Sequence, residues 1–120
     1  MTDPPALPTR RLGARGPEVT RLGLGCAPLG NLYSAISDDE AEATVVAAFD
    51  AGIRLFDTAP LYGHGLSEQR LGSALVGRPR DSYVLATKVG RLLRARQAGG
   101  GPSIFIDAPP VEPVFDFSHD

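Results

Sequence analysis

The sequence predicts an α/β fold in which short strands and helices alternate along the chain. Apolar segments bounded by turn residues predict strands near 22–25, 54–57 and 83–88, and helical spacing predicts helices at 38–51 and 67–75 between them. Connections long enough to hold a helix imply parallel strands joined by right-handed crossovers, with the helices on the outer face of the sheet. A content of 42% apolar and 22% charged residues fits a globular domain of this kind.

Two features are predicted before this alternation begins. Residues 1–8 are rich in proline and have little apolar surface to bury, so we expect a disordered tail. Residues 11–13 and 18–20 flank Gly16-Pro17, which is a turn signal, and together they predict a short hairpin.

The first helix has a signal at each end. Ser37 and Glu40 form a capping box, in which each side chain satisfies a backbone donor of the first turn. Gly52 lies where a left-handed residue ends a helix, so the helix is predicted to run to about Ala51. Its apolar face consists of Ala41, Val45, Ala48 and Phe49.

The second half of the alternation is read from weaker signals. Arg54 to Asp57 form the second strand, and Ser67 is predicted to cap a helix that runs to about Leu75. Glu68 in the first turn suits the positive end of the helix dipole. Tyr83 to Lys88 then form the third strand.

The pattern stops after Gly90, and residues 90–113 are predicted to be a long loop. The segment contains Gly99, Gly100, Gly101, Pro102, Pro109, Pro110 and Pro113. Only 104–106 is a possible strand fragment. Loops of this length inside a domain usually cover a functional site. Residues 115–120 are predicted to approach another helix, with Ser118 as its N-cap.

Charge and cysteine content restrict the partners and the compartment. A net charge of −2 argues against a nucleic acid or an anionic membrane as the main partner. Arg91, Arg94 and Arg96 are interpreted as a solvated loop. No apolar run is long enough to span a membrane, and the N-terminus does not have the pattern of a secretory signal. A single cysteine, Cys26, allows no internal disulfide and is consistent with the cytoplasm.

Three side chains are predicted to converge at one edge of the sheet. Neighbouring parallel strands lie ~4.8 Å apart and end on the same edge. Asp57 and Lys88, taken as the last residues of their strands, are therefore expected to form an ion pair, with Tyr62 in the loop beside them. Singly, Asp57 can satisfy turn donors, Tyr62 can pack on the rim and Lys88 can be solvated. Together they favour a chemical role at the edge where α/β proteins bind ligands.

The predicted chemistry is proton transfer by the phenol. A tyrosine with a pKa near ~10 is a poor proton donor at neutral pH, and an adjacent ammonium lowers that pKa by stabilising the phenolate. Lys88 supplies the ammonium and Asp57 holds it in place, so Tyr62 can give a proton to a carbonyl oxygen as hydride reaches carbon. His64 is near enough to touch a substrate, although a loop histidine without a role is an equal alternative. We expect no metal site, and Pro28 in place of a third glycine excludes a Rossmann fingerprint.

Several motifs resemble, in order and spacing, the N-terminal part of the aldo-keto reductases. They are Gly23-Leu24-Gly25, the run from Phe56 to Gly63, Ser67-Glu68 with Leu71-Gly72, and Ala86-Thr87-Lys88. The resemblance covers about residues 9–90. Residues 27–33 and 115–118 are most similar to the aldose dehydrogenase branch, which includes fucose and galactose dehydrogenases.

The resemblance implies a TIM (β/α)8 barrel whose N-terminal hairpin closes the bottom, and hydride transfer between NADP or NAD and a sugar or another carbonyl or alcohol. It implies that Tyr62 is the acid–base residue, that Lys88 and Asp57 tune it, and that Gly25, Cys26 and Asp57 lie at the cofactor. A buried inert thiol is the favoured role of Cys26. His64 is the candidate substrate contact.

The chain of 120 residues is short of the ~250 of such a barrel. We therefore expect residues 9–120 to form an incomplete barrel of about three strands and two helices, inactive alone and marginally stable. The fourth active-site residue of the family, a histidine, would lie beyond Asp120, and His119 does not replace it. The alternative is a truncated non-catalytic module that self-associates or binds a partner through its exposed sheet edge.

Overall fold

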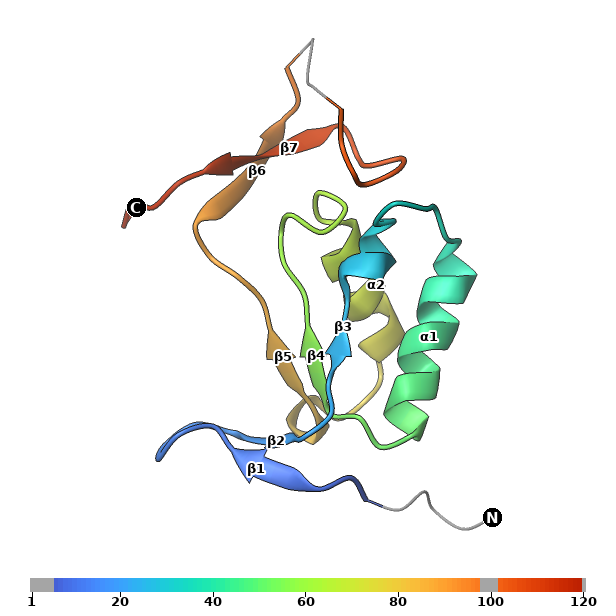
Figure 1. The fold of residues 1–120 in the computed structure, drawn as a ribbon, viewed down its shortest axis with the longest axis vertical. Helices are drawn as coiled ribbons and strands as arrows, with labels where there is room; N and C mark the ends of the chain where they lie inside the picture. The colour runs from blue at the N-terminus through green and yellow to red at the C-terminus, as the bar shows by residue number, and fades with distance from the viewer. Residues whose placement is uncertain (1–5, 98–101, 120) are drawn as a thin grey trace.

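A computed structural model describes residues 6–97 and 102–119. Figure 1 shows three parts along the long axis of the molecule: a small parallel sheet with two helices on one side of it, a hairpin at one end of the sheet, and a two-stranded ribbon at the other end. The central part has the strand, helix, strand, helix, strand order predicted from the sequence. It corresponds to the first part of a β/α barrel, and the barrel is incomplete.

The N-terminal hairpin is confirmed. Strands β1 (Thr9–Arg11) and β2 (Glu18–Thr20) pair antiparallel, and Leu12 N donates to Pro17 O at 3.0 Å across the turn. The hairpin lies at the end of the sheet where the parallel strands begin (Figure 1). Most of the predicted disordered tail, residues 1–5, lies outside the described residues. Pro8 belongs to the hairpin region, because its carbonyl accepts a hydrogen bond from Arg21 N at 2.8 Å.

The central sheet has the order β3-β4-β5, with all strands parallel. Its strands are β3 (Leu24–Gly25), β4 (Leu55–Asp57) and β5 (Val84–Ala86). Asp57 pairs with Gly25 on one side and with Ala86 on the other. The prediction that Lys88 ends the third strand was wrong by two residues. Thr58 N makes the last bond of the ladder, to Ala86 O at 2.8 Å, after which the chain leaves the sheet.

The first helix, α1 (Asp38–Asp50), begins and ends as predicted. Its capping box is complete: Ser37 N donates to Glu40 Oε2 at 2.8 Å, and Glu40 N donates to Ser37 Oγ at 3.1 Å. Gly52 follows with a φ of 97°, in the left-handed region that a glycine adopts without strain. The capping residues therefore fix where the chain turns back into β4.

The second helix, α2 (Leu66–Leu75), is not capped by Ser67 as predicted. The residue at its N-cap is Gly65, two residues earlier, whose φ of 93° turns the chain into the helix. Ser67 consequently falls on the buried side of the first turn. Its hydroxyl donates to Cys26 O at 2.7 Å instead of bonding to its own helix.

The core lies between the sheet and the two helices. The largest buried side chains are Phe56, Leu71, Val45 and Cys26. Phe56 and Leu85 pair across β4 and β5 and therefore share a face of the sheet, but Phe56 is fully buried whereas Leu85 is 40% exposed. The helices thus cover the β3 and β4 side of the outer face more completely than β5. No helix among the described residues combines the length and hydrophobicity needed to cross a bilayer.

The prediction of a long loop at 90–113 was wrong in part. Strands β6 (Arg91–Ala95) and β7 (Val111–Phe115) begin inside this segment and pair as an antiparallel ribbon, and β7 continues past its end. Pro113 lies inside β7. This is possible because both strands of a two-stranded ribbon are edge strands, so that the missing N–H of proline can fall on the unpaired edge. The predicted fragment at 104–106 makes only an isolated bridge, between Leu32 and Phe105. Two 3-10 turns, η1 (Ala27–Gly30) and η2 (Arg80–Ser82), complete the described elements.

The prediction of a loop at the arginines was wrong for Arg91 and Arg94, which belong to β6, although Arg94 is exposed to solvent as predicted. Arg91 lies 4.6 Å from the centroid of the Phe115 ring, and Arg94 forms an ion pair with Asp116 at 3.4 Å. The predicted helix approach is also absent among residues 115–119, where Ser118 N donates to the Asp116 carboxylate at 2.9 Å and no helix begins.

Candidate active site

The centre of the candidate site is the ion pair between Lys88 and Asp57. Lys88 Nζ lies 3.2 Å from both Asp57 carboxylate oxygens and donates to Thr58 O at 2.9 Å. Each of the two charged side chains is 48% exposed. The predicted pairing at the carboxyl end of the sheet is therefore present, although Lys88 reaches it from the segment after β5 and not from the strand itself.

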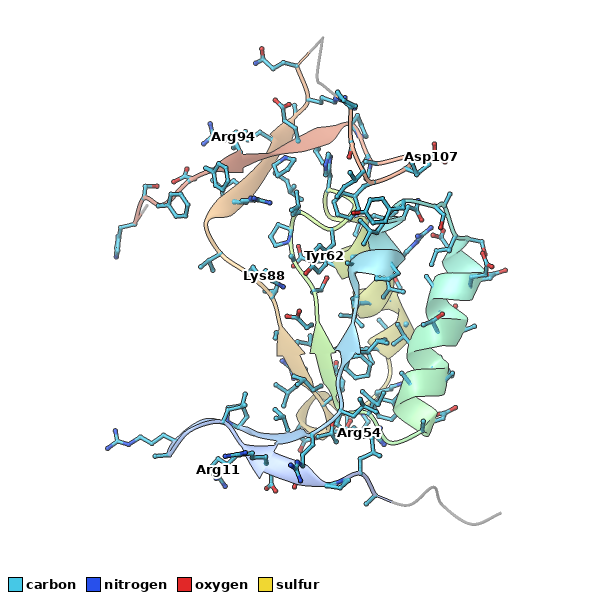
Figure 2. The ribbon with its side chains drawn as sticks, viewed as in Figure 1. Arg11, Arg54, Tyr62, Lys88, Arg94 and Asp107 are labelled. Atoms are coloured by element: carbon cyan, nitrogen blue, oxygen red, sulfur yellow. The ribbon has the colours of Figure 1, made fainter. Side chains whose placement is uncertain are left out.

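Tyr62 completes the predicted group of three side chains. Lys88 Nζ lies 4.8 Å from the centroid of the Tyr62 ring, and Figure 2 shows the two residues close together between the sheet and the ribbon. Partial burial lowers the pKa of Lys88, but hydrogen bonds and charge interactions with Asp57 and Tyr62 outweigh it, so that the net shift of the pKa is upward. The ammonium is thus the stable form of Lys88 beside the phenol.

The loop that carries Tyr62 is held by a series of short turns. Tyr62 N donates to Ala59 O and Ser67 N donates to Tyr62 O, each at 3.1 Å. The Tyr62 ring lies 6.4 Å from the ring of Phe105, which is 5% exposed and belongs to the segment between β6 and β7. Residues distant in the sequence therefore set the position of the phenol.

A cavity of about 400 Å³ opens beside Tyr62 and Lys88. Its other walls are formed by Ala59, Pro60, Leu61, Val89, Gly90, Arg91, Phe115 and Phe117. The rings of Phe115 and Phe117 are stacked, with centroids 5.8 Å apart and planes at 19°. A molecule in this cavity would lie between Tyr62 and Lys88 on one side and an aromatic wall of Phe115 and Phe117 on the other.

Gly25 and Cys26, two of the three predicted cofactor residues, differ in the groups that they expose. Gly25 pairs with Asp57 at the sheet edge, and a β-carbon on it would meet nothing within 4 Å, so open space adjoins the backbone there. The side chain of Cys26 is fully buried in the core. Burial and the Asp57 charge raise the pKa of its thiol to about 11. The backbone of Cys26 is used within the protein as well, because its N–H donates to Asp57 O at 2.8 Å and its carbonyl accepts from Ser67 Oγ at 2.7 Å, so Cys26 presents no free group to a ligand.

His64 lies outside the cavity that contains Tyr62 and Lys88. It lines a neighbouring cavity of about 360 Å³, its Nδ1 lies 3.0 Å from Val111 O, and its ring is 6.1 Å from that of Phe105. Because a carbonyl can only accept, Nδ1 carries the proton of this hydrogen bond. In this structure His64 ties the Tyr62 loop to β7. Its predicted contact with substrate remains a prediction.

The sequence prediction did not include Thr58, Ser67, Phe105 or Phe117 among the residues around the site. For Lys88 the sequence contains a further signal that the prediction did not use. Lys88 is the only lysine in a chain with 11 arginines. No group of three potential metal-ligating side chains gathers anywhere in residues 6–97 and 102–119.

Comparison with known proteins identifies the family. The model of the aldo/keto reductase family matches residues 21–106, and the chain belongs to this family. Among curated relatives, D-threo-aldose 1-dehydrogenase of Pseudomonas is 59% identical over 68% of this chain and 25% of its own length. Pyridoxal 4-dehydrogenase of Microbacterium luteolum is 44% identical over 92% of this chain and 35% of its own length. L-galactose dehydrogenase of Arabidopsis thaliana is 46% identical over 68% of this chain and 26% of its own length.

Solved structures of the family match the fold. An aldo-keto reductase of Bacillus halodurans in its holo form has a TM-score of 0.64 at 37% identity, over 78% of this chain and 28% of that one. The glycerol dehydrogenase of Gluconobacter oxydans has a TM-score of 0.63 at 30% identity, over 90% of this chain and 30% of that one. This chain therefore spans about a quarter to a third of the length of the relatives it matches.

Proposed function

We propose that this chain supplies the acid–base part of the active site of an NAD(P)-dependent oxidoreductase. The reaction moves hydride between nicotinamide and a sugar or another small carbonyl or alcohol compound. The observation that carries the proposal is the convergence of the Asp57 carboxylate, the Lys88 ammonium and the Tyr62 phenol at the carboxyl end of a parallel sheet. Membership of the aldo/keto reductase family supports it.

Each of the three residues has a defined part in the proposed reaction. In the direction of reduction, Tyr62 gives its hydroxyl proton to the carbonyl oxygen, and in oxidation its phenolate takes the proton from the alcohol. Lys88 stabilises the phenolate by its positive charge. Asp57 accepts hydrogen bonds from Lys88 and keeps the ammonium charged and in place.

The residues present fit a nicotinamide cofactor. Bound nicotinamide supplies or accepts the hydride. Gly25 leaves open space at the sheet edge beside Asp57, where a side chain would block a flat ring. We assign Gly25, Cys26 and Asp57 to the cofactor side of the site, with Cys26 acting from the core through its hydrogen bond to Asp57 O. The proposal includes NADP and NAD alike.

The substrate side of the site is the cavity between Tyr62 and the ribbon. The names of three relatives, dehydrogenases of D-threo-aldose, pyridoxal and L-galactose, favour a small polar carbonyl or sugar substrate. The stacked rings of Phe115 and Phe117 suit the C–H face of a sugar ring. His64, in the adjacent cavity, is the proposed contact for a substituent that extends past Leu61, which lines both cavities.

We also propose that the 120-residue polypeptide has no turnover by itself and that it works in the cytoplasm. Leu55 and Val84, which pair on the face of the sheet opposite Phe56, are only half-buried, and beside Gly25 the site is open. An open site leaves water around the reacting groups and weakens electrostatic stabilisation. The single buried cysteine suits a reducing compartment.

The test is a Tyr62→Phe substitution in a complete enzyme that carries this segment. We expect kcat for nicotinamide-linked oxidation of an aldose to fall by about 10²–10⁴-fold, because the phenylalanine cannot transfer a proton. Binding of the nicotinamide nucleotide should be unchanged. Tyr33→Phe is the matched control, since Tyr33 is 74% exposed and does not line the cavity. Turnover within a few-fold of the parent at every pH would exclude Tyr62 as the proton donor.

A further inference from the structure

Two buried hydroxyl groups are hydrogen-bonded to each other next to the ion pair, and neither has a part in the proposed proton transfer. They belong to Thr58, the residue after β4, and Ser67, in the first turn of α2. We propose that Thr58 and Ser67 are positioning residues for Lys88: they fix the carbonyl that holds the ammonium, and so aim it at Tyr62. The kinetic part of this proposal rests on the function proposed above.

The Thr58 carbonyl makes the shortest hydrogen bond of the Lys88 ammonium. Its distance to Nζ is 2.9 Å, against 3.2 Å for each oxygen of Asp57. An ammonium has three donors. One donor is given to Thr58 O and one is shared by the two oxygens of the Asp57 carboxylate, which leaves the third for the side of Tyr62, whose ring centroid lies 4.8 Å from Nζ. A shift of the Thr58 carbonyl would therefore rotate the proton away from the phenol.

Thr58 is held by three elements at once. Its backbone N–H donates to Ala86 O of β5 at 2.8 Å, and its Oγ1 lies 2.8 Å from Ser67 Oγ. Ser67 Oγ donates to Cys26 O at 2.7 Å. Since the single hydroxyl proton of Ser67 is used on Cys26, Thr58 must be the donor to Ser67. The chain of hydrogen bonds ends at a carbonyl, which cannot pass a proton on, so its role is to hold and not to conduct.

The network is buried and closed. Thr58 is 5% exposed, Ser67 and Cys26 are fully buried, and Cys26 N donates back to Asp57 O at 2.8 Å. No side-chain polar atom buried among the described residues is left without a partner. Polar groups that are fully satisfied in a low-dielectric interior make a rigid support, and loss of one partner leaves the other unpaired.

The ion pair alone cannot provide this rigidity. Lys88 and Asp57 are each 48% exposed, and such a pair holds its geometry weakly because the lysine side chain is long and flexible and solvent screens both charges. The Thr58 carbonyl belongs to the backbone and is anchored to the core, so it supplies the fixed point. The error in the predicted cap of α2 has the same cause: Ser67 serves the sheet edge and not its own helix.

The kinetic experiment compares Thr58→Val, which keeps the shape but removes the hydroxyl, with Thr58→Ser, which keeps the hydroxyl. In a complete enzyme that carries this segment, we expect Thr58→Val to lower kcat by about 10- to 100-fold with little change in KM, and Thr58→Ser to restore most of it. Ser67→Ala should have the same effect, and the double variant Thr58→Val with Ser67→Ala should be no worse than either single one. Ser73→Ala, on the exposed part of the same helix, is the control.

A second measurement tests the proposal without catalysis. Because Lys88 is the only lysine, its side-chain NMR signal in the 120-residue chain needs no assignment. We expect the apparent pKa of Lys88 to fall in Thr58→Val and in Ser67→Ala, and to stay near the parent value in Thr58→Ser and Ser73→Ala. Equal titration in the parent and both disrupting variants overturns the proposal, as do equal kinetics of Thr58→Val and Thr58→Ser in an enzyme whose turnover falls in Tyr62→Phe. If the titration shifts as expected but no variant of Tyr62 or Thr58 affects turnover, the positioning holds and the proposed function fails.

Discussion

Gly30 and Gly63 lie backbone against backbone, and this contact sets the position of the loop that carries Tyr62. A β-carbon on Gly30 would lie 2.5 Å from Gly63 N and from the Tyr62 carbonyl carbon, and one on Gly63 would lie 2.6 Å from Gly30 Cα. Rotation of a side chain cannot relieve a clash with backbone atoms. The loop and the η1 turn can therefore approach this closely only because both residues are glycine.

Gly30→Ala is expected to destabilise the fold and displace Tyr62. The added methyl group forces the two backbone segments apart, which costs about 1–3 kcal/mol of the free energy of unfolding, as overpacking of a tight core does. Chemical denaturation measures this change. Gly72→Ala is the control of opposite sign, because its β-carbon meets nothing within 4 Å and alanine stabilises a helix relative to glycine by about 0.5–1 kcal/mol. Equal stability of Gly30→Ala and the parent contradicts the contact.

The raised pKa of Lys88 predicts how stability changes in alkaline solution. A lysine whose pKa is higher in the folded chain than its ordinary ~10.4 stabilises the fold fully below ~10.4, and this contribution is lost as the pH rises through the folded value. The parent should therefore lose stability over that interval more steeply than Asp57→Asn. Because the pair is half-exposed, the difference is small. Identical pH profiles of unfolding in the two proteins would show that Asp57 does not hold the ammonium.

The buried thiol of Cys26 should be unreactive in the native chain. Its pKa is raised to about 11, first by burial and then by the charge of Asp57, and the thiolate is the reactive form. A thiol reagent at mildly alkaline pH is expected to label the single cysteine only as fast as the chain unfolds, and at once in denaturant. The rate of labelling measured against denaturant concentration checks this. A native rate equal to the denatured rate would place Cys26 at the surface.

Phe117 is expected to contribute to substrate binding and not to the chemical step. In a complete enzyme that carries this segment, Phe117→Ala should raise KM for an aldose by about 10-fold at unchanged kcat, because a ring contact of 1–3 kcal/mol is lost equally from the ground and transition states. Val76→Ala is the control, since Val76 is 80% exposed and does not line the cavity. A fall in kcat with unchanged KM would instead assign Phe117 to the reacting geometry.

Local signals were enough to predict the central part of the fold. The capping box of α1 and the left-handed Gly52 depend only on neighbours in the sequence, and they are where the sequence placed them. The ribbon was missed because Pro113 and the nearby glycines argue against a strand, whereas pairing with 91–95 compensates for them. The start of α2 was misplaced because Ser67 is the residue type that favours an N-cap, whereas the left-handed Gly65 takes that position.

The candidate site was predictable where topology alone decides it. Parallel strands end on one edge, which brings Asp57 near the segment that contains Lys88. The residues that support this pair could not be found in the same way. Ser67 meets Thr58 and Phe105 meets Tyr62 only through tertiary packing, and neither residue has a chemical signature of its own.

The single lysine has a consequence for handling the protein. Reagents that attach proteins to beads or dyes through amines can reach only two groups here, Lys88 and the α-amino terminus. Coupling at strongly alkaline pH would acylate Lys88 and erase the charge at the candidate site. Near neutral pH the terminus, with a pKa of ~7.7–8.0, reacts first, while the raised pKa of Lys88 protects it. The buffer chosen for immobilisation thus decides whether the attached protein keeps its site.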